Sequence, residues 1–233
     1  SDDYHDRSDH TDTHRDHEPG SDGEHRHPDA DADEDHGVNA AQPVRAAAAL
    51  AAALVFAPPA WRFTRHLVTL VHEAGHAVVA VLTGRRLNAI RLHTDTSGLT
   101  LSTGRPRGPG MMATAAAGYL APAALGLGSV ALVGAGETDI ALYAGLAVLA
   151  LMLAFIRNRF GLLVVGITGA AVAALVWRAD QRVPDFAALT LAWFLLIAAP
   201  RTVLDLWSHR RHVRSRTSDA DILARLTHLP AAV

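Results

Sequence analysis

The chain has 233 residues, half of them hydrophobic, with 14 histidines but no cysteine and no lysine. This length allows one or two domains, and the lack of cysteine excludes disulfides and thiolate metal ligands. The net charge of −2 conceals an asymmetry. Residues 1–37 carry 14 acidic side chains and 3 arginines, whereas the remainder carries 18 arginines and 9 acidic side chains.

Residues 1–39 are rich in Asp and His and contain almost no large hydrophobic residue. Such a segment cannot bury enough surface to fold, so we predict that it is disordered. Seven of the histidines lie in it. The composition favours a solvated low-complexity tail, and a tail that collects metal ions stays open as the alternative.

The first hydrophobic segment, residues 46–57, is rich in alanine and ends at Pro58 and Pro59. It is short for a bilayer, so whether it spans stays open. A longer apolar segment follows, for which we predict a helix over residues 63–82. Within this helix stands the sequence His72-Glu-Ala-Gly-His76.

His72 and His76 are four residues apart, so a helix places both on one face, where they can bind one ion. Two imidazoles at this spacing are typical of a zinc site, in which Glu73 takes a proton from zinc-bound water. The structural alternative is a helix with a few packed polar residues. An ionised side chain at mid-bilayer costs roughly 2.5–3.5 kcal/mol, however, and a bound metal would compensate for this cost.

Residues 85–110 are polar and arginine-rich, and a loose alternation from Ile90 to Ser102 around Ser97-Gly98 predicts a β-hairpin. Four further hydrophobic segments are long enough, or nearly so, to cross a bilayer. They are Met111–Gly136, Ile140–Ile156, Phe160–Trp177 and Phe186–Pro200. We therefore predict an all-α polytopic membrane protein with about five or six transmembrane helices, a small membrane-associated β-hairpin and a disordered N-terminal tail.

The arginines gather in residues 85–110, in residues 157–159 and after Pro200. These regions fall on one side if every segment spans, and the positive-inside rule makes that side cytoplasmic. We expect a multi-pass protein of the cell membrane, with a transmembrane domain over residues 40–211 and a cytoplasmic C-terminal segment over residues 212–233. Anionic lipid explains the arginines, so we expect no nucleic-acid partner.

Four segments in order resemble the site-2 protease family of intramembrane zinc metalloproteases, in particular a bacterial branch. Residues 69–77 are similar to its first core helix, and the hairpin around residues 97–100 to its membrane-associated strands. Residues 117–122 are similar to a glycine-containing motif of its next helix, and residues 218–230 to a C-terminal segment of that branch. The resemblance extends over residues 60–233.

The resemblance implies a zinc metalloendopeptidase that hydrolyses peptide bonds of membrane-anchored protein substrates with zinc-activated water. By position, it implies His72 and His76 as zinc ligands and Glu73 as the general base. It also implies that Gly118 and Pro122 shape the helix that faces the substrate, although tight helix packing explains Gly118 equally well. The hairpin could bind an unwound substrate by strand addition, or it could be purely structural.

The third zinc ligand departs from the family, which takes it from an Asp in a later transmembrane helix. None of the four later hydrophobic segments contains Asp, Glu or His. The candidates are therefore Asp205, Asp219 and Asp221. Ser218 and Asp221 have the spacing of a capping box, so we prefer Asp219 as the ligand, although an acidic residue in a first turn also suits the helix dipole.

Two other functions stay open. A metal-handling membrane protein or transporter would use the His-rich tail together with the histidine pair, but the internal repeats of many transporters are missing from the sequence. A catalytically inactive relative would bind transmembrane helices without cleaving them.

Overall fold

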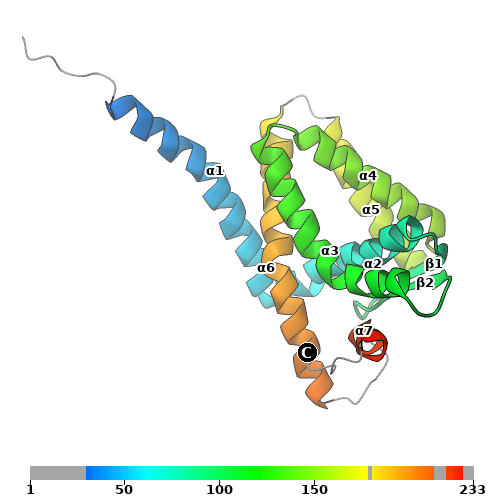
Figure 1. The fold of residues 1–233 in the computed structure, drawn as a ribbon. Helices are drawn as coiled ribbons and strands as arrows, with labels where there is room; N and C mark the ends of the chain where they lie inside the picture. The colour runs from blue at the N-terminus through cyan, green and yellow to red at the C-terminus, as the bar shows by residue number, and fades with distance from the viewer. Residues whose placement is uncertain (1–29, 178–179, 213–218, 228–233) are drawn as a thin grey trace, which may run out of the picture. The chain divides into compact units, whose positions relative to one another are not determined.

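The computed structural model of the protein describes residues 30–177, 180–212 and 219–227 (Figure 1). The chain divides into two units, residues 1–38 and 39–233, and the site described below belongs to the second. The first helix, α1 (Ala30–Phe56), begins in the last part of the segment for which the composition predicts disorder. Most of that segment, with six of its seven histidines, lies outside the described residues.

Further helices and one hairpin follow α1 in the described residues. The helices are α2 (Pro58–Leu82), α3 (Pro109–Gly134), α4 (Thr138–Phe155), α5 (Arg159–Val176), α6 (Arg182–His212) and α7 (Asp219–Thr227), and the strands are β1 (Arg86–Leu92) and β2 (Gly98–Thr103). Prolines occupy the first positions of α2, where a backbone N–H has no partner within the helix. Gly84, with a φ of 71°, turns the chain from α2 into β1.

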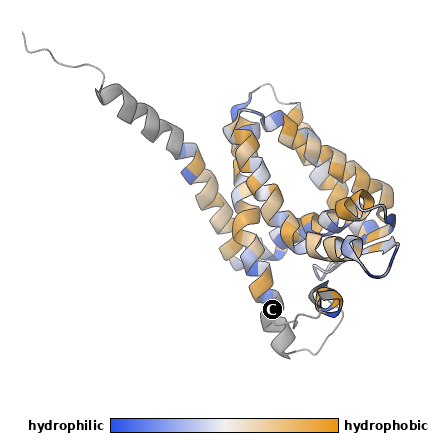
Figure 2. Ribbon diagram, viewed as in Figure 1, coloured by the Kyte–Doolittle hydropathy of each residue, from blue (hydrophilic) through white to orange (hydrophobic). Residues whose placement is uncertain are grey.

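Four helices are long and apolar enough to cross a membrane: α3, α4, α5 and residues Arg182–Asp205 of α6 (Figure 2). Residues 42–56 of α1 and the whole of α2 pass the same test together, but they are bent by 100°. The described residues thus contain four candidate spans, or five if the bent pair is one span. The predicted helical membrane architecture with a β-hairpin is confirmed, and the number of spans reaches the low end of the expected range if the bent pair is one span.

Small residues let the backbones of α2, α3 and α6 approach closely. A Cβ added to Gly75 of α2 would lie 2.4 Å from Ala121 Cβ and 2.7 Å from the Ala117 carbonyl oxygen of α3. A Cβ added to Gly126 of α3 would lie 3.0 Å from the Ala192 carbonyl oxygen of α6. Helix α3 therefore packs tightly against both neighbours.

Strands β1 and β2 form an antiparallel pair, and the connection between α4 and α5 covers the other edge of β1. Ile156 bridges to Ile90, whose carbonyl accepts a hydrogen bond of 3.0 Å from the Arg157 N–H. The Asn158 side chain accepts from the N–H of Leu92 and donates to its carbonyl. Within the part of the chain that the structure describes, β2 has no strand on its other edge.

Helix α6 continues past Pro200, where the hydrophobic pattern predicts that the apolar segment ends. A proline inside a membrane helix is tolerated when neighbouring groups satisfy the backbone. The next residue, Arg201, donates a hydrogen bond to the Val55 carbonyl, and its guanidinium carbon lies 4.4 Å from the centroid of the Trp61 ring. This contact holds α6 beside the bend between α1 and α2.

The described parts of the three arginine-rich regions lie around one end of the helices. The hairpin pairs with Ile156 between α4 and α5, and the hairpin, Thr202 of α6 and Asp219 of α7 line one cavity. At the N-terminal ends of α4 and α6, Thr138 donates a hydrogen bond to Asp185. The hairpin, the α4–α5 connection and Thr202 thus lie away from the N-terminal ends of α4 and α6.

Candidate metal centre

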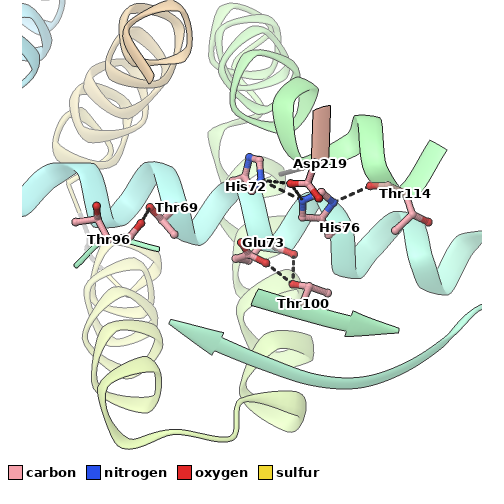
Figure 3. Close-up of polar contacts among 8 residues, drawn as sticks. All are labelled: Thr69, His72, Glu73, His76, Thr96, Thr100, Thr114 and Asp219. Atoms are coloured by element: carbon pink, nitrogen blue, oxygen red, sulfur yellow. Dashed lines mark hydrogen bonds and ion pairs between the residues drawn. The ribbon is translucent and has the colours of Figure 1, made fainter. Parts of the chain in front are cut away.

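Helix α2 places His72 and His76 one turn apart on the same face, as their spacing predicts. The ring centroids are 4.6 Å apart and the planes are nearly perpendicular, at 86°. The two Nε2 atoms point at each other across 3.0 Å (Figure 3). His76 is almost fully buried, with 6% of its surface exposed.

Helix α7 brings a carboxylate to the same point, although it lies far away in the sequence. Asp219 Oδ2 lies 3.2 Å from His72 Nε2 and 3.1 Å from His76 Nε2 (Figure 3). These residues form the one group of three or more histidine and acidic side chains with metal-binding spacing in the described parts of the chain. We call the three side chains the His-His-Asp group.

The geometry of the His-His-Asp group fits a tetrahedral zinc ion. Ligands bound at 2.0–2.1 Å in a tetrahedron are about 3.3 Å apart. The three distances between the ligand atoms, 3.0, 3.1 and 3.2 Å, come close to this value. Three protein ligands would leave the fourth position open, as in catalytic rather than structural zinc sites.

Hydrogen bonding also favours a cation at this point. His76 Nδ1 lies 2.7 Å from the carbonyl oxygen of Thr114, which can only accept, so this nitrogen carries the proton. In the neutral ring, Nε2 then has a lone pair, and it faces a carboxylate oxygen. His76 and Asp219 would both hold a metal ion placed at this point, which would relieve this repulsion, and the Thr114 carbonyl would fix the ring as the outer partners of metal ligands do.

The Asp219 carboxyl is well suited to stay ionised. Burial alone would raise its pKa, but the neighbouring imidazoles of His72 and His76 outweigh burial and hold the pKa below its ordinary value. Asp219 is also in the first turn of α7, where the helix dipole stabilises a negative charge. A charged carboxylate is the form that binds a metal.

Glu73 lies beside the His-His-Asp group but does not belong to it. Only 3% of its surface is exposed, and its Oε2 accepts a hydrogen bond of 2.6 Å from the hydroxyl of Thr100 on β2 (Figure 3). The carboxylate therefore points toward the hairpin, on a face of α2 next to the histidine pair. This position suits a base better than a ligand.

The other two carboxylate candidates lie outside the His-His-Asp group. Asp205 lines the same cavity from α6. Asp221 lies in the first turn of α7, and its backbone carbonyl accepts a hydrogen bond from Arg225. Ser218, the other half of the expected capping box, lies outside the described residues.

A cavity of about 690 Å³ surrounds the site. It is lined by α2, the hairpin, α3, the end of α6 and α7, and it includes both glycine-motif residues, Gly118 and Pro122. A Cβ on Gly118 would lie 2.4 Å from His76 Nε2 and 2.6 Å from His72 Cε1. Gly118 thus makes room for the histidine rings of the neighbouring helix α2.

Three residues of the site were not among the residues to which the sequence analysis assigned a role, although two of them lie in segments that carry the family resemblance. They are Thr100, which bonds Glu73; Thr114, which bonds His76; and Tyr119, whose ring lies 5.3 Å from that of His72. Tyr119 follows Gly118 directly in the sequence, and this neighbourhood is the sequence signal for its place at the site, because both lie on α3, which packs against α2.

The model of the Peptidase M50B-like family matches residues 45–233 of the chain. The match covers well over half of the sequence and includes every residue of the His-His-Asp group and Glu73. No curated protein matches the chain, and no solved structure matches it.

Proposed function

Because this chain belongs to the Peptidase M50B-like family, whose members are site-2 protease-like, we propose that it is an intramembrane zinc metalloprotease. It would hydrolyse peptide bonds of membrane-anchored protein substrates. The observation that carries the proposal is the convergence of His72, His76 and Asp219 on one point, beside a buried Glu73 and within a cavity.

In the proposed reaction, the His-His-Asp group holds zinc and Glu73 moves protons. Zinc bound there would lower the pKa of a water molecule and polarise the substrate carbonyl. Glu73 would accept a proton from the attacking water and pass it to the nitrogen of the leaving amine. Its near-complete burial keeps bulk water from competing for that proton.

The open edge of β2 supports binding of the substrate as an extended strand. The backbone groups of Ile90 and Leu92 bond to the α4–α5 connection, so they point away from β2. In an antiparallel pair, the residues opposite them also direct their backbone groups outward. These residues are Gly98 and Thr100. Their N–H and C=O groups therefore lie on the free edge, beside the cavity.

A substrate strand on this edge would solve a chemical problem of cleavage within a membrane. A peptide bond in a transmembrane helix is shielded by its own hydrogen bonds and side chains. Pairing with Gly98 and Thr100 would replace those hydrogen bonds and expose the scissile carbonyl. Gly118 and Pro122, on the α3 wall of the cavity, would then face the substrate.

The arginine distribution supports a multi-pass protein of the cell membrane whose site opens toward the cytoplasm. The described parts of the arginine-rich regions lie near the end of the helices that carries the hairpin. By the positive-inside rule this end is cytoplasmic, together with residues 212–233. The substrate would therefore be cut near the cytoplasmic boundary.

The test is cleavage of a membrane-anchored peptide by the wild type and by Glu73→Gln. We expect the variant to lose about 10²-fold to 10⁴-fold in kcat, the usual contribution of a general base, and to keep its zinc. If metal transport persists and no peptide is cut by either protein, the protein handles metal instead. If the wild type binds helices but never cleaves them, it is an inactive relative.

A further inference from the structure

The Glu73 carboxylate is held by β2 as well as by its own helix. Its Oε2 accepts the hydrogen bond from Thr100, and the Thr100 hydroxyl also lies 3.4 Å from the Glu73 backbone carbonyl. Its Oε1 lies against Gly98, where an added Cβ would come within 2.4 Å. Gly98 and Thr100 are two residues apart, so they share one face of the strand. This face of β2 contacts both carboxylate oxygens.

A second hydrogen bond ties the hairpin to α2 near the same place. The Thr69 hydroxyl donates to the Thr96 carbonyl over 2.8 Å, one helical turn before Glu73 (Figure 3). The strand is thus fixed to the helix on both sides of Gly98. A glutamate side chain has three rotatable bonds, so the helix alone does not determine where its carboxylate points.

The same two residues face the substrate edge. Their backbone groups lie in the plane of the sheet and point to the open edge of β2. The Thr100 side chain leaves this plane and points to Glu73. The strand that would receive the substrate is therefore the strand that holds the base. Resting on the function proposed above, we propose that Thr100 is a positioning residue, which fixes the Glu73 carboxylate relative to the bound peptide.

A purely structural role for Thr100 is the competing explanation. A buried carboxylate needs a hydrogen-bond donor, and losing it destabilises the folded protein. That role predicts a lower melting temperature with an unchanged kcat in the protein that stays folded. A positioning role predicts a lower kcat at constant KM, because a misplacement of about 1 Å can reduce the rate about 10²-fold.

The experiment compares Thr100→Val, which removes the hydroxyl at constant shape, with Thr100→Ser, which keeps it. We expect Thr100→Val to lower kcat by about 10-fold to 100-fold, with KM within about twofold and zinc content unchanged. Thr100→Ser should stay within about threefold of the wild type. The matched control is Thr103→Val, which removes an exposed hydroxyl from the end of the same strand and should change neither constant.

Several results would overturn the proposal while the proposed function stands. Thr100→Val could keep the wild-type kcat, or its defect could appear only in KM or in zinc content. Thr100→Ser could also lose as much kcat as Thr100→Val, which would show that keeping the hydroxyl does not preserve the rate.

A binding measurement decides the role of Thr100 without a substrate. A peptide hydroxamate binds zinc and donates a hydrogen bond to the base, so its Kd reports the position of Glu73. We expect a Kd about 5-fold to 20-fold weaker in Thr100→Val and in Glu73→Gln, and no further loss when the two are combined. An additional loss in the double variant would contradict the proposal. Zinc-loaded wild type that binds the hydroxamate but cleaves nothing would instead refute the proposed function alone.

Discussion

Helices α2 and α7 contribute to the same candidate metal centre in different ways. Helix α2 supplies two histidines from the middle of 25 residues that pack tightly on α3. Helix α7 supplies one carboxylate from the first turn of nine residues, 143 positions after His76. The histidine pair is fixed by one helix, whereas Asp219 reaches it only if α7 docks.

This difference has a thermodynamic consequence. A helix of nine residues is marginal in isolation, so its position depends on tertiary contacts and on any metal it binds. Zinc binding and the docking of α7 should therefore reinforce each other, because each favours the same assembled state. The α2 side of the site should be intolerant of small changes in volume, and the α7 side should respond to zinc concentration.

The intolerance of the α2 side is tested at Gly118. In Gly118→Ala, the added Cβ would lie 2.4 Å from His76 Nε2, and the packed helices leave the ring little room to retreat. We expect zinc affinity to fall by about 10-fold to 100-fold, in the range seen when the groups around a metal's ligands are disturbed. Isothermal titration with zinc measures the loss.

Gly128→Ala is the control for that measurement. It adds the same methyl group to the same helix, at an exposed position with nothing within 4 Å. It should leave zinc affinity unchanged. Equal zinc affinities for Gly118→Ala and Gly128→Ala would show that the histidine rings have room to move, contrary to the tight packing of the α2 side.

A smaller effect is expected from loosening α7. Ile222 is half-buried and lines the cavity, so Ile222→Ala should weaken docking of the helix by roughly 1–2 kcal/mol. Zinc affinity should fall by about 5-fold to 30-fold, and saturating zinc should restore activity, unlike in Glu73→Gln. A titration of activity against free zinc distinguishes Ile222→Ala from Glu73→Gln. Arg225→Gln, at an exposed position of α7, is the control. An activity loss in Ile222→Ala that zinc does not reverse would refute the coupling between zinc binding and the docking of α7.

Local features of the sequence predicted most of the fold. The hydrophobic segments became α3 to α6, the alternation around Ser97-Gly98 became the hairpin, and the spacing of His72 and His76 placed both rings on one face. The resemblance to the site-2 proteases is confirmed by the family match. These signals succeed because each depends on residues that are close together in the chain.

The remaining features depend on contacts between distant segments. The spacing of Asp205, Asp219 and Asp221 in the sequence does not reveal which carboxylate the fold brings to the histidines. Asp219 was preferred only because a capping box with Ser218 accounts for Asp221. The bond from Thr100 to Glu73 depends on how the hairpin lies across α2. The bend of 100° before α2 likewise depends on packing, since Pro58 and Pro59 permit a bend without fixing its angle.

The most direct test of the account is the zinc content of purified protein carrying Asp219→Ala, measured beside Asp205→Ala and Asp221→Ala. The wild type should hold about one zinc per chain, Asp219→Ala should lose most of it, and the other two should keep it, because only Asp219 places an oxygen within 3.2 Å of both imidazoles. A wild type without zinc, or Asp219→Ala with full zinc, would contradict the account.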